Sequence, residues 1–407
     1  MARKKKIDII ATEDAHGPRT YQKFPIAVVR GKGALVWDDK GKEYVDCMGG
    51  YGVAIVGHSN DDVVAAIKHQ AETLITCHGS LYNDARAQFL ETLTSCSPKG
   101  LDAAFLSNSG AEAVEVAIKL ARKVTGKKGL IAMKGAFHGK TAGALSATWN
   151  KRYKEPFEPL LQNFKHVENG DLGALEREID KDVAAVIFEP IQGEGGIVMP
   201  PDGYVKGLRE ICDKHDLLLI ADEIQTGLGR TGKLWAVQNW GVVPDIMTTA
   251  KGLAGGVPIG ATVTRADILH QLKKGEQTST FGGNPLACAA GTATLNYILK
   301  HDLPGQAAKK GKAFLKKLKA MGADHVLTRE ARGLGLMLAF ELRVDIPDIL
   351  NESMSLGAIF TYSGRTIVRM LPPLVITEPQ IEKSVNILGR AIAAEENRRS
   401  SAGGGLG

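Results

Sequence analysis

Residues 217–234 read LLLIADEIQTGLGRTGKL, an apolar run that ends in Asp222 and Glu223 and leads into a glycine-rich segment. The run is typical of a buried strand, and residues 227–233 fit the G-x-x-x-x-G-K pattern of a phosphate-binding loop. Such a loop opens a helix and ends in lysine followed by serine or threonine, because that hydroxyl binds the metal. Here Leu234 follows the lysine. We therefore reject an ATPase and expect Asp222 to serve something other than a magnesium ion.

The run at 217–222 is one of six apolar runs between residues 103 and 264, namely AAFLS, GLIAM, AAVIFEP, LLLIAD, DIMTTA and GATVT. Helical segments such as EAVEVAIKLARKV separate them. Runs without polar alternation indicate strands that are covered on both faces. We therefore predict an α/β fold whose large domain, residues 51–298, holds a mixed, mainly parallel sheet flanked by helices.

The two ends of the chain differ from this pattern. Residues 26–47 predict a β-hairpin region that turns at DDKGK. Past residue 300, a helix precedes the strand-like LGLMLAFEL and TIVRMLPPL, and Thr377 and Gln380 have capping-box spacing before a last helix. We expect a smaller α+β domain at 299–395, with residues 1–50 packed against it and a disordered tail at 396–407.

The composition limits the class of protein. The 407 residues are 44% hydrophobic and 24% charged, with no ~20-residue apolar span and no apolar signal core in MARKKKIDII, so we expect no membrane contact and a cytoplasmic location. The five cysteines form no C-x-x-C pair, which argues against disulfides and a metal site. The net charge of +6 is modest, and its lysine clusters lack interleaved aromatics, so solvated helix faces are favoured over nucleic-acid binding.

Polar residues follow the expected strands at the edge where open sheets of this kind bind ligands. This rule selects Ser109, Glu189, Asp222 and the loop that ends at Lys251. Asp222 and Glu223 adjoin on one strand, so their side chains should point to opposite faces and cannot act as a catalytic pair. Lys251 stands among small residues after an apolar strand, where lysine is unusual unless it is paired or functional.

These residues combine into one kind of site. LSNSGAEAVEVA would place the Ser109 hydroxyl and a helix N-terminus around a phosphate, although such a motif is often only a helix cap. FHG at 137–139 offers a flat ring, or merely packing. A phosphate site, a ring to stack on, a carboxylate for a pyridinium and an amine for a Schiff base are the requirements of pyridoxal 5′-phosphate.

With these motifs the chain resembles the class III aminotransferases of the ornithine and acetylornithine group over nearly its whole length. The matching motifs are SNSGAEA, FHGKT, EPIQGEGG, ADEIQTGLGRTGK, AKGLAGGVPIG, STFGGNPLA, RGLGLM and IVRMLPPL. The resemblance implies the pyridoxal-phosphate-dependent fold type I, which is aspartate aminotransferase-like, and a homodimer with active sites at the subunit interface.

The resemblance also implies roles for single residues. Lys251 would be the catalytic Schiff-base lysine, and Asp222 would hold the pyridinium. The other cofactor contacts would be Gln225 to the 3′ oxygen, Phe137 on the ring with His138 beside it, and Ser109, Gly110, Ala111 and the other subunit's Ser279 and Thr280 around the phosphate.

On the substrate side, Arg369 would receive a carboxylate, and Glu194 would mask Arg369 when an ω-amine is the donor. Tyr51 would help to place the substrate carboxyl, and Glu189 is added from its strand-end position. Lys140 stands where the family usually has arginine in FHGRT, and lysine cannot form the same bidentate fork. Weaker binding of 2-oxoglutarate, or a substrate whose α-amine and carboxylate are presented differently, would explain this departure.

Within the group, LSATWNKRYKEPFEPL at 145–160 most resembles enzymes that transaminate lysine or ornithine attached to the amino-group carrier protein LysW, in lysine and arginine biosynthesis. That carrier is acidic, so Lys151, Arg152 and Lys154 would be contacts, or else ordinary loop charges. Glutamate or 2-oxoglutarate would be the second substrate. N-acetylornithine is the alternative donor; an aminomutase or a decarboxylase is a further alternative, and a regulatory binder would be expected to lack Lys251 or Asp222.

Overall fold

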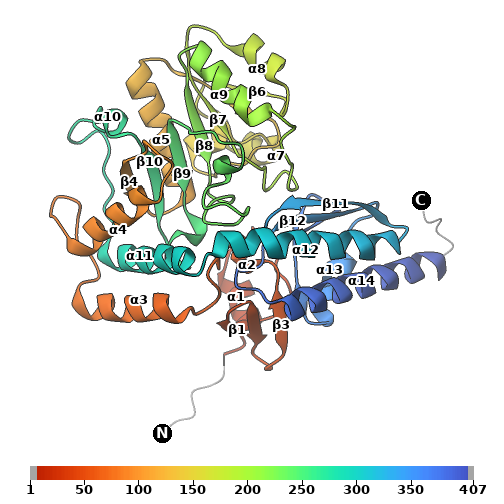
Figure 1. Cartoon of the computed structure of the whole chain (residues 1–407). Coiled ribbons are helices and arrows are strands. Elements are labelled where there is room, and N and C mark those ends of the chain that lie inside the picture. Colours follow the sequence, from red (N-terminus) through yellow and green to blue (C-terminus); the bar gives the residue numbers. More distant parts are fainter. Residues whose placement is uncertain (1–6, 402–407) are drawn as a thin grey trace.

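A seven-stranded sheet forms the centre of the larger part of the molecule (Figure 1). The computed structural model describes residues 7–401. The strand order is β4-β10-β9-β8-β7-β5-β6, and all neighbours are parallel except β10, which is antiparallel to β4 and β9. The strands are β4 (Ala103–Ser107), β5 (Gly129–Met133), β6 (Phe164–Val167), β7 (Val183–Phe188), β8 (Leu218–Asp222), β9 (Ile246–Thr249) and β10 (Gly260–Thr264).

The six apolar runs are all strands of this sheet, as predicted, and the mixed, mainly parallel sheet is confirmed. Every residue of β5 and β7 is buried, because neighbouring strands and packed helices cover them. The sequence pattern missed β6, an edge strand whose FKHV carries Lys165 and His166 and therefore has no apolar run.

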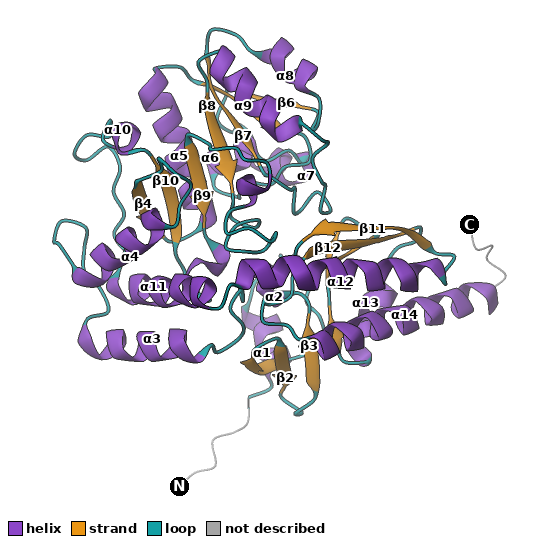
Figure 2. Cartoon of the chain, in the orientation of Figure 1, coloured by secondary structure: helices purple, strands orange, loops and turns teal. Residues whose placement is uncertain are grey.

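Helices accompany this sheet in the larger part of the molecule (Figure 2). They are α3 (Asp61–Thr73), α4 (Asp84–Ser95), α5 (Gly110–Thr125), α6 (Ala142–Ala147), α7 (Lys151–Lys154), α8 (Leu172–Glu178), α9 (Tyr204–Lys214), α10 (Ala266–Leu269) and α11 (Pro285–Lys300). α5 packs against β9 and β10, and its buried face consists of apolar residues at helical spacing. This helix matters for function because it begins directly after β4, at the carboxyl end of that strand.

The smaller part of the molecule is a second sheet with three helices. Its strands are β11 (Thr328–Leu334), β12 (Met337–Leu342), β15 (Ile367–Met370) and β14 (Thr361–Ser363), antiparallel and in that order. α12 (Leu303–Ala323) packs against β11 and β12, α14 (Glu378–Ser401) packs against α12, and α13 (Pro347–Ser355) packs against α14. Figure 1 shows α11 and α12 one after the other across the middle of the view, joining the larger part to the smaller.

The N-terminal segment pairs with the C-terminal part of the chain. It contains α1 (Ile9–His16), β1 (Val28–Lys32), β2 (Leu35–Asp38), β3 (Glu43–Asp46) and α2 (Gly49–Gly52). β1, β2 and β3 form an antiparallel ribbon, and β3 then pairs in parallel with β13 (Ala358–Ile359). The hairpin expected to turn at DDKGK is present between β2 and β3.

The last helix corrects one expectation. Thr377 and Gln380 form the predicted capping box, in which the Thr377 N–H donates to Oε1 of Gln380 at 2.9 Å and the Gln380 N–H to Oγ1 of Thr377 at 3.4 Å. α14 then continues to Ser401, so residues 396–401 are helical, and a tail beginning at 396 was wrong. Glu395 supports this end by pairing with Arg399 at 2.7 Å, one turn later. Residues 402–407 lie outside the described residues.

The described residues can be compared with the features of membrane proteins, metalloproteins and disulfide-linked proteins. None of their helices is long and apolar enough to cross a membrane. Between residues 7 and 401, no group of three or more His, Cys, Asp or Glu side chains is placed to hold a metal ion. All five cysteines are free thiols.

Candidate active site

A cavity of about 400 Å³ lies at the carboxyl ends of β4, β7, β8 and β9. In Figure 2 the strands β8 and β9 point toward the middle of the molecule, where the small sheet approaches. The cavity is lined by ten of the predicted site residues: Ser109, Gly110, Ala111, Phe137, His138, Glu189, Glu194, Asp222, Gln225 and Lys251. Strand-end position selected Ser109, Glu189, Asp222 and Lys251 among them, and the family resemblance supplied most of the others.

The N-terminus of α5 forms one end of the cavity. Ser109 is the N-cap of this helix, and its hydroxyl oxygen accepts from the Glu112 N–H at 3.2 Å. The Glu112 carboxylate reaches back to accept from the N–H of Asn108, the residue before the N-cap, at 2.7 Å. Backbone N–H groups and the positive end of the helix dipole converge here, so this end of the cavity suits an anion.

Asp222 lies at the end of β8, almost completely buried. Its Oδ2 is 2.7 Å from Nδ1 of His138, and its Oδ1 accepts from the Ile224 N–H at 3.1 Å and from the Thr248 hydroxyl at 3.2 Å. The carboxylate is therefore held in one orientation. Glu223 points away, since its oxygens accept from the Thr226 hydroxyl and the Val237 N–H. The two acids do not act together.

Lys251 follows β9 at the start of a short 3-10 helix (Lys251–Ala254). Its φ is 44°, in the left-handed region that non-glycine residues rarely adopt. Burial lowers the pKa of the Lys251 amine, while the nearby carboxylates of Glu194, Asp222 and Glu189 act in the opposite direction. A lowered pKa increases the fraction of neutral amine, which is the nucleophilic and proton-accepting form.

Glu189 and Gln225 line the cavity between these groups. Oε1 of Glu189 accepts from the Phe137 N–H at 2.9 Å, and its Oε2 accepts from the Gly193 N–H at 3.0 Å. Burial raises the pKa of the Glu189 carboxyl to about 7. Gly193 lies so close to Gln225 that a Cβ at position 193 would stand 2.0 Å from Oε1 of Gln225. Both oxygens of Glu189 thus hold backbone, one on the Phe137 loop and one on the loop that leads to Glu194.

Arg369 approaches from the small sheet, on β15. Its side chain is fully buried, Nε donates to the Tyr362 carbonyl at 2.9 Å, and Nη2 lies 2.8 Å from Oε1 of Glu194. The guanidinium carbon is 5.8 Å from the centre of the Tyr51 ring. Arg369 and Tyr51 are not themselves part of the cavity lining; Arg369 reaches it through Glu194, and Tyr51 lies beside Arg369.

Lys140 also stands outside the lining. Its Nζ is 4.3 Å from the centre of the Tyr153 ring, a cation–π distance, and that ring meets Phe137 edge-on with 6.1 Å between ring centres. Sequence reasoning singled out Lys140 and Phe137 but missed Tyr153, although an aromatic between basic residues in the α7 segment was a signal that could have found it.

The structure does not bring Ser279 and Thr280 to this cavity within the chain. Ser279 lines a separate surface groove, where its hydroxyl is 3.3 Å from Nδ2 of Asn108, and Thr280 is exposed. Residues 227–233, the rejected phosphate loop, form turns before a 3-10 helix (Ala236–Asn239), and no α-helix opens there.

The residues of the cavity fit pyridoxal phosphate. Nε2 of His138 and Oε1 of Gln225, and Nη1 of Arg369 just outside the lining, are buried without a hydrogen-bond partner in the described part of the chain. Buried polar atoms are almost always paired, so these atoms indicate a polar ligand. The α5 N-terminus would hold a phosphate, Asp222 a protonated ring nitrogen and Lys251 an aldehyde. Bound there, the cofactor supplies an electron sink that stabilises negative charge on the substrate carbon next to nitrogen.

A half-buried lysine, an oriented carboxylate and an anion cradle at the carboxyl ends of an α/β sheet are the arrangement of a pyridoxal-phosphate-dependent enzyme. Comparison with protein families makes the assignment specific, because the model for "Aminotransferase class-III" matches residues 16–392. The chain belongs to the class III aminotransferases, and the predicted fold type I, the cofactor and the aminotransferase activity are confirmed.

Individual relatives agree with this family. The acetylornithine aminotransferase of Methanopyrus kandleri is 47% identical over 383 residues, which cover 94% of this chain and 98% of that protein. A [LysW]-aminoadipate semialdehyde/glutamate semialdehyde transaminase of Sulfurisphaera tokodaii is 41% identical over 92% of this chain and 97% of its own length. The crystal structure of ornithine aminotransferase from Toxoplasma gondii superposes with a TM-score of 0.93 at 35% identity, covering 97% of both chains. The chain is thus an aminotransferase of the acetylornithine and ornithine type.

Proposed function

We propose that this aminotransferase takes the terminal amino group of a diamino acid whose α-amine is blocked by acylation, with N-acetylornithine as donor and 2-oxoglutarate as acceptor. The pairing of Arg369 with Glu194 beside Lys251 carries the proposal. An ω-amine donor and a dicarboxylate must use one site in turn. When the Glu194 carboxylate covers the Arg369 guanidinium, the site suits the ω-amine donor. When Glu194 moves away, the free guanidinium suits the dicarboxylate. The identity with acetylornithine aminotransferases supports the choice of donor.

The chain's own residues divide the work. The neutral Nζ of Lys251 accepts a proton from the substrate carbon that bears nitrogen and returns it to the acceptor carbon. Asp222, held by His138 and Thr248, keeps a negative charge opposite the ring nitrogen. Phe137 would stack on the cofactor ring, and Gln225 would contact its 3′ oxygen. Arg369 binds the second carboxylate of glutamate or 2-oxoglutarate.

An assay of glutamate formation from 2-oxoglutarate tests the donor. We expect kcat/KM for N-acetylornithine to exceed that for ornithine by at least about tenfold, since a blocked α-amine avoids a second positive charge near Arg369. Equal or better use of free ornithine would contradict the proposal, as would carbon dioxide release without glutamate formation.

Carrier-linked lysine or ornithine is the second candidate donor. The basic residues of α7 beside the cavity, Lys151 and Arg152, favour it. Tyr153 contacts Phe137, so α7 flanks the entrance, and its Lys151 and Arg152 are exposed. Lys154 instead turns inward and donates to the Ser146 carbonyl at 3.2 Å. The relatives named for LysW-linked substrates, at about 41% identity, support this candidate.

Charge reversal separates the two donors. The double variant Lys151→Glu and Arg152→Glu should raise KM for carrier-linked lysine about tenfold at low salt, because an acidic carrier loses its attraction, and should leave KM for N-acetylornithine unchanged. The matched control is Lys316→Glu with Lys319→Glu, on the exposed face of α12. An unchanged KM for the carrier-linked donor would show that Lys151 and Arg152 are ordinary surface charges that do not bind the carrier.

We also propose a homodimer in which Ser279 and Thr280 reach the phosphate site of the other subunit. Large apolar side chains are exposed near these residues: Phe281 follows Thr280 directly, and Leu81 and Tyr82 follow Ser80, which lines the same groove as Ser279. An exposed apolar patch of this kind supports burial by a second copy. Light scattering should give twice the chain mass, and Phe281→Asp should lower both that mass and the affinity for the cofactor. A monomeric wild-type protein with full activity would contradict the proposal.

A further inference from the structure

The turn at residues 192–198 carries Glu194 and has an unfavourable backbone. Gln192 and Val198 pair with each other, with N–H to carbonyl distances of 3.2 and 3.0 Å. Ile197 is fully buried with a φ of 56°, which is a rare conformation for a β-branched residue. Such strain persists only where surrounding contacts fix the backbone. Contacts around the 192–198 turn must therefore stabilise this backbone conformation.

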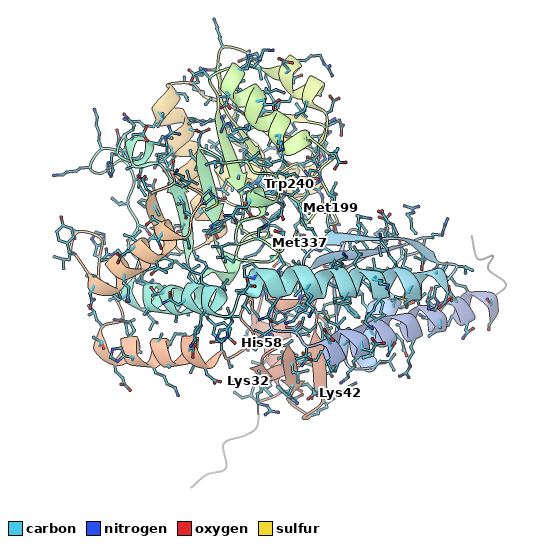
Figure 3. All side chains as sticks on the ribbon, in the orientation of Figure 1. Lys32, Lys42, His58, Met199, Trp240 and Met337 are labelled. Atoms are coloured by element: carbon cyan, nitrogen blue, oxygen red, sulfur yellow. The ribbon has the colours of Figure 1, made fainter. Side chains whose placement is uncertain are left out.

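Apolar packing fixes the turn to the small sheet. Ile197 is buried against Met337 on β12 and Leu371 after β15, and Met199 and Trp240 border the same cluster. Figure 3 labels Met199, Trp240 and Met337 at the junction between the upper and lower parts of the molecule. The strained residue thus lies where the two parts of the chain meet.

Polar contacts from the small sheet hold the backbone of the turn. Arg332 on β11 donates from Nη2 to the Gly196 carbonyl at 2.8 Å and from Nε to the Ile197 carbonyl at 3.2 Å. Glu341 orients Arg332 through a 2.6 Å contact to Nη1. The hydroxyl of Ser363, on β14, donates to the carbonyl of Glu194 itself. Gly196 has a φ of 109°, and a Cβ there would stand 2.6 Å from Cδ1 of Ile367, so only glycine allows this approach.

The large sheet holds the same turn from the other side. Glu189 accepts from the Gly193 N–H at 3.0 Å, and Nε2 of Gln192 donates to the Lys134 carbonyl at 2.8 Å. The backbone on both sides of Glu194 is therefore fixed, while the Glu194 side chain remains 32% exposed. Arg369 is also fixed, by its bond to the Tyr362 carbonyl. These contacts hold the backbone on both sides of Glu194 and leave its side chain room to rotate.

We propose that Arg332 and Ser363 are positioning residues that set substrate selectivity by holding the backbone of Glu194 in register with Arg369. This inference rests on the proposed function, in which Glu194 covers and uncovers Arg369. With the backbone held, the Glu194 carboxylate returns to the same guanidinium edge after each half-reaction. With the backbone loosened, Arg369 stays uncovered for longer. Glutamate then binds more readily, and the α-carboxylate of an N-acylated donor binds Arg369 in an unproductive orientation.

The test measures the two half-reactions separately, by mixing cofactor-loaded enzyme with N-acetylornithine or with glutamate and following the visible absorbance of the bound cofactor. The variants are Ser363→Ala, which removes one hydroxyl and little else, and Arg332→Gln. The ratio of second-order rate constants, glutamate over N-acetylornithine, should rise about fivefold to tenfold in each, as expected for one lost hydrogen bond. Arg332→Lys should restore part of the wild-type ratio.

Two controls separate selectivity from general damage. Arg329 lies on the same strand and pairs with Glu341 at 2.9 Å, but it has no hydrogen bond to the 192–198 turn among the described residues, so Arg329→Gln should keep the wild-type ratio. In a Glu194→Ala background, Ser363→Ala should cause no further change, because the positioning acts through the Glu194 carboxylate.

The outcomes distinguish this inference from the proposed function. If wild-type enzyme reacts with both donors and the ratio is unchanged in both variants, the positioning role is wrong while the proposed function stands. A change in ratio that persists equally in the Glu194→Ala background would also overturn it. If wild-type enzyme reacts with neither donor, the proposed function fails and the inference fails with it.

Discussion

Nδ1 of His138 lies 2.7 Å from Oδ2 of Asp222, and both side chains are almost completely buried at the end of β8. The imidazole, the Thr248 hydroxyl and the Ile224 N–H together fix the carboxylate, so Asp222 meets a ligand with one defined orientation. This arrangement is suited to holding a positive ring nitrogen, because the charge is in place before the ligand binds and needs no reorganisation.

Asp222→Asn should keep the fold and lose about 10²–10³-fold in kcat, because an amide cannot stabilise the protonated ring nitrogen. The measurement is the initial rate of glutamate formation with saturating donor. The adjacent carboxylate provides a matched control, since Glu223 faces the other side of the strand and bonds to Thr226 and Val237. Glu223→Gln should retain nearly all activity at neutral pH; comparable losses in both variants would contradict the assigned role.

Glu223 also predicts a pH dependence of stability. Burial raises the pKa of its carboxyl from 4.5 to about 7. Between these values the folded chain binds a proton that the unfolded chain does not, so this group lowers the free energy of unfolding as the pH rises from 4.5 to 7, by up to about 1.4 kcal/mol per pH unit. Above pH 7 its effect is constant.

Glu223→Gln has no such proton, so the variant should gain stability relative to wild type as the pH rises through this window. Urea unfolding of both proteins at pH 5, 6, 7 and 8 gives the difference in free energy. A difference that stays constant, or that shrinks with rising pH, would show that the buried carboxyl is charged throughout.

Lys140→Arg tests the unusual residue in FHGKT. Lysine at this position contacts the Tyr153 ring and offers a single point charge, whereas arginine offers a bidentate fork. We expect KM to fall about threefold for one of the two substrates, N-acetylornithine or 2-oxoglutarate, whichever places a carboxylate near position 140, with kcat unchanged. Lys151→Arg, on exposed α7, is the matched control. If KM for donor and acceptor is the same in both variants as in wild type, position 140 has no part in substrate binding.

The sequence predicted the elements that are determined by residues close together in the chain. The six apolar strands follow from periodicity, the Thr377–Gln380 capping box from residue spacing, and the cavity residues Ser109, Glu189, Asp222 and Lys251 from their positions after strands. The other predicted lining residues came from the family resemblance. β6 and β11 were missed because both are strands with polar residues and lack an apolar run.

The contacts that hold Glu194 were beyond sequence reasoning for a different reason. Arg332 meets the Gly196 and Ile197 carbonyls from 136 and 135 positions away in the chain, and nothing local to RGLGLM indicates that partner. The left-handed Ile197 is equally hidden, since a β-branched residue predicts extended backbone. Both depend on how the small sheet meets the 192–198 turn, which only the folded chain determines.

The most direct test of amino transfer through Lys251 is a single-turnover measurement of wild type and Lys251→Ala, each loaded with pyridoxal phosphate and mixed with N-acetylornithine in the absence of acceptor. We predict that the visible absorbance of bound cofactor in wild type changes once and stoichiometrically, and that added 2-oxoglutarate reverses the change. Lys251→Ala should retain bound cofactor, because Asp222 and the α5 N-terminus remain, but should show no donor-driven proton transfer on the same timescale. A Lys251→Ala enzyme that turns over at the wild-type rate, or a wild type that binds no cofactor, would contradict the account.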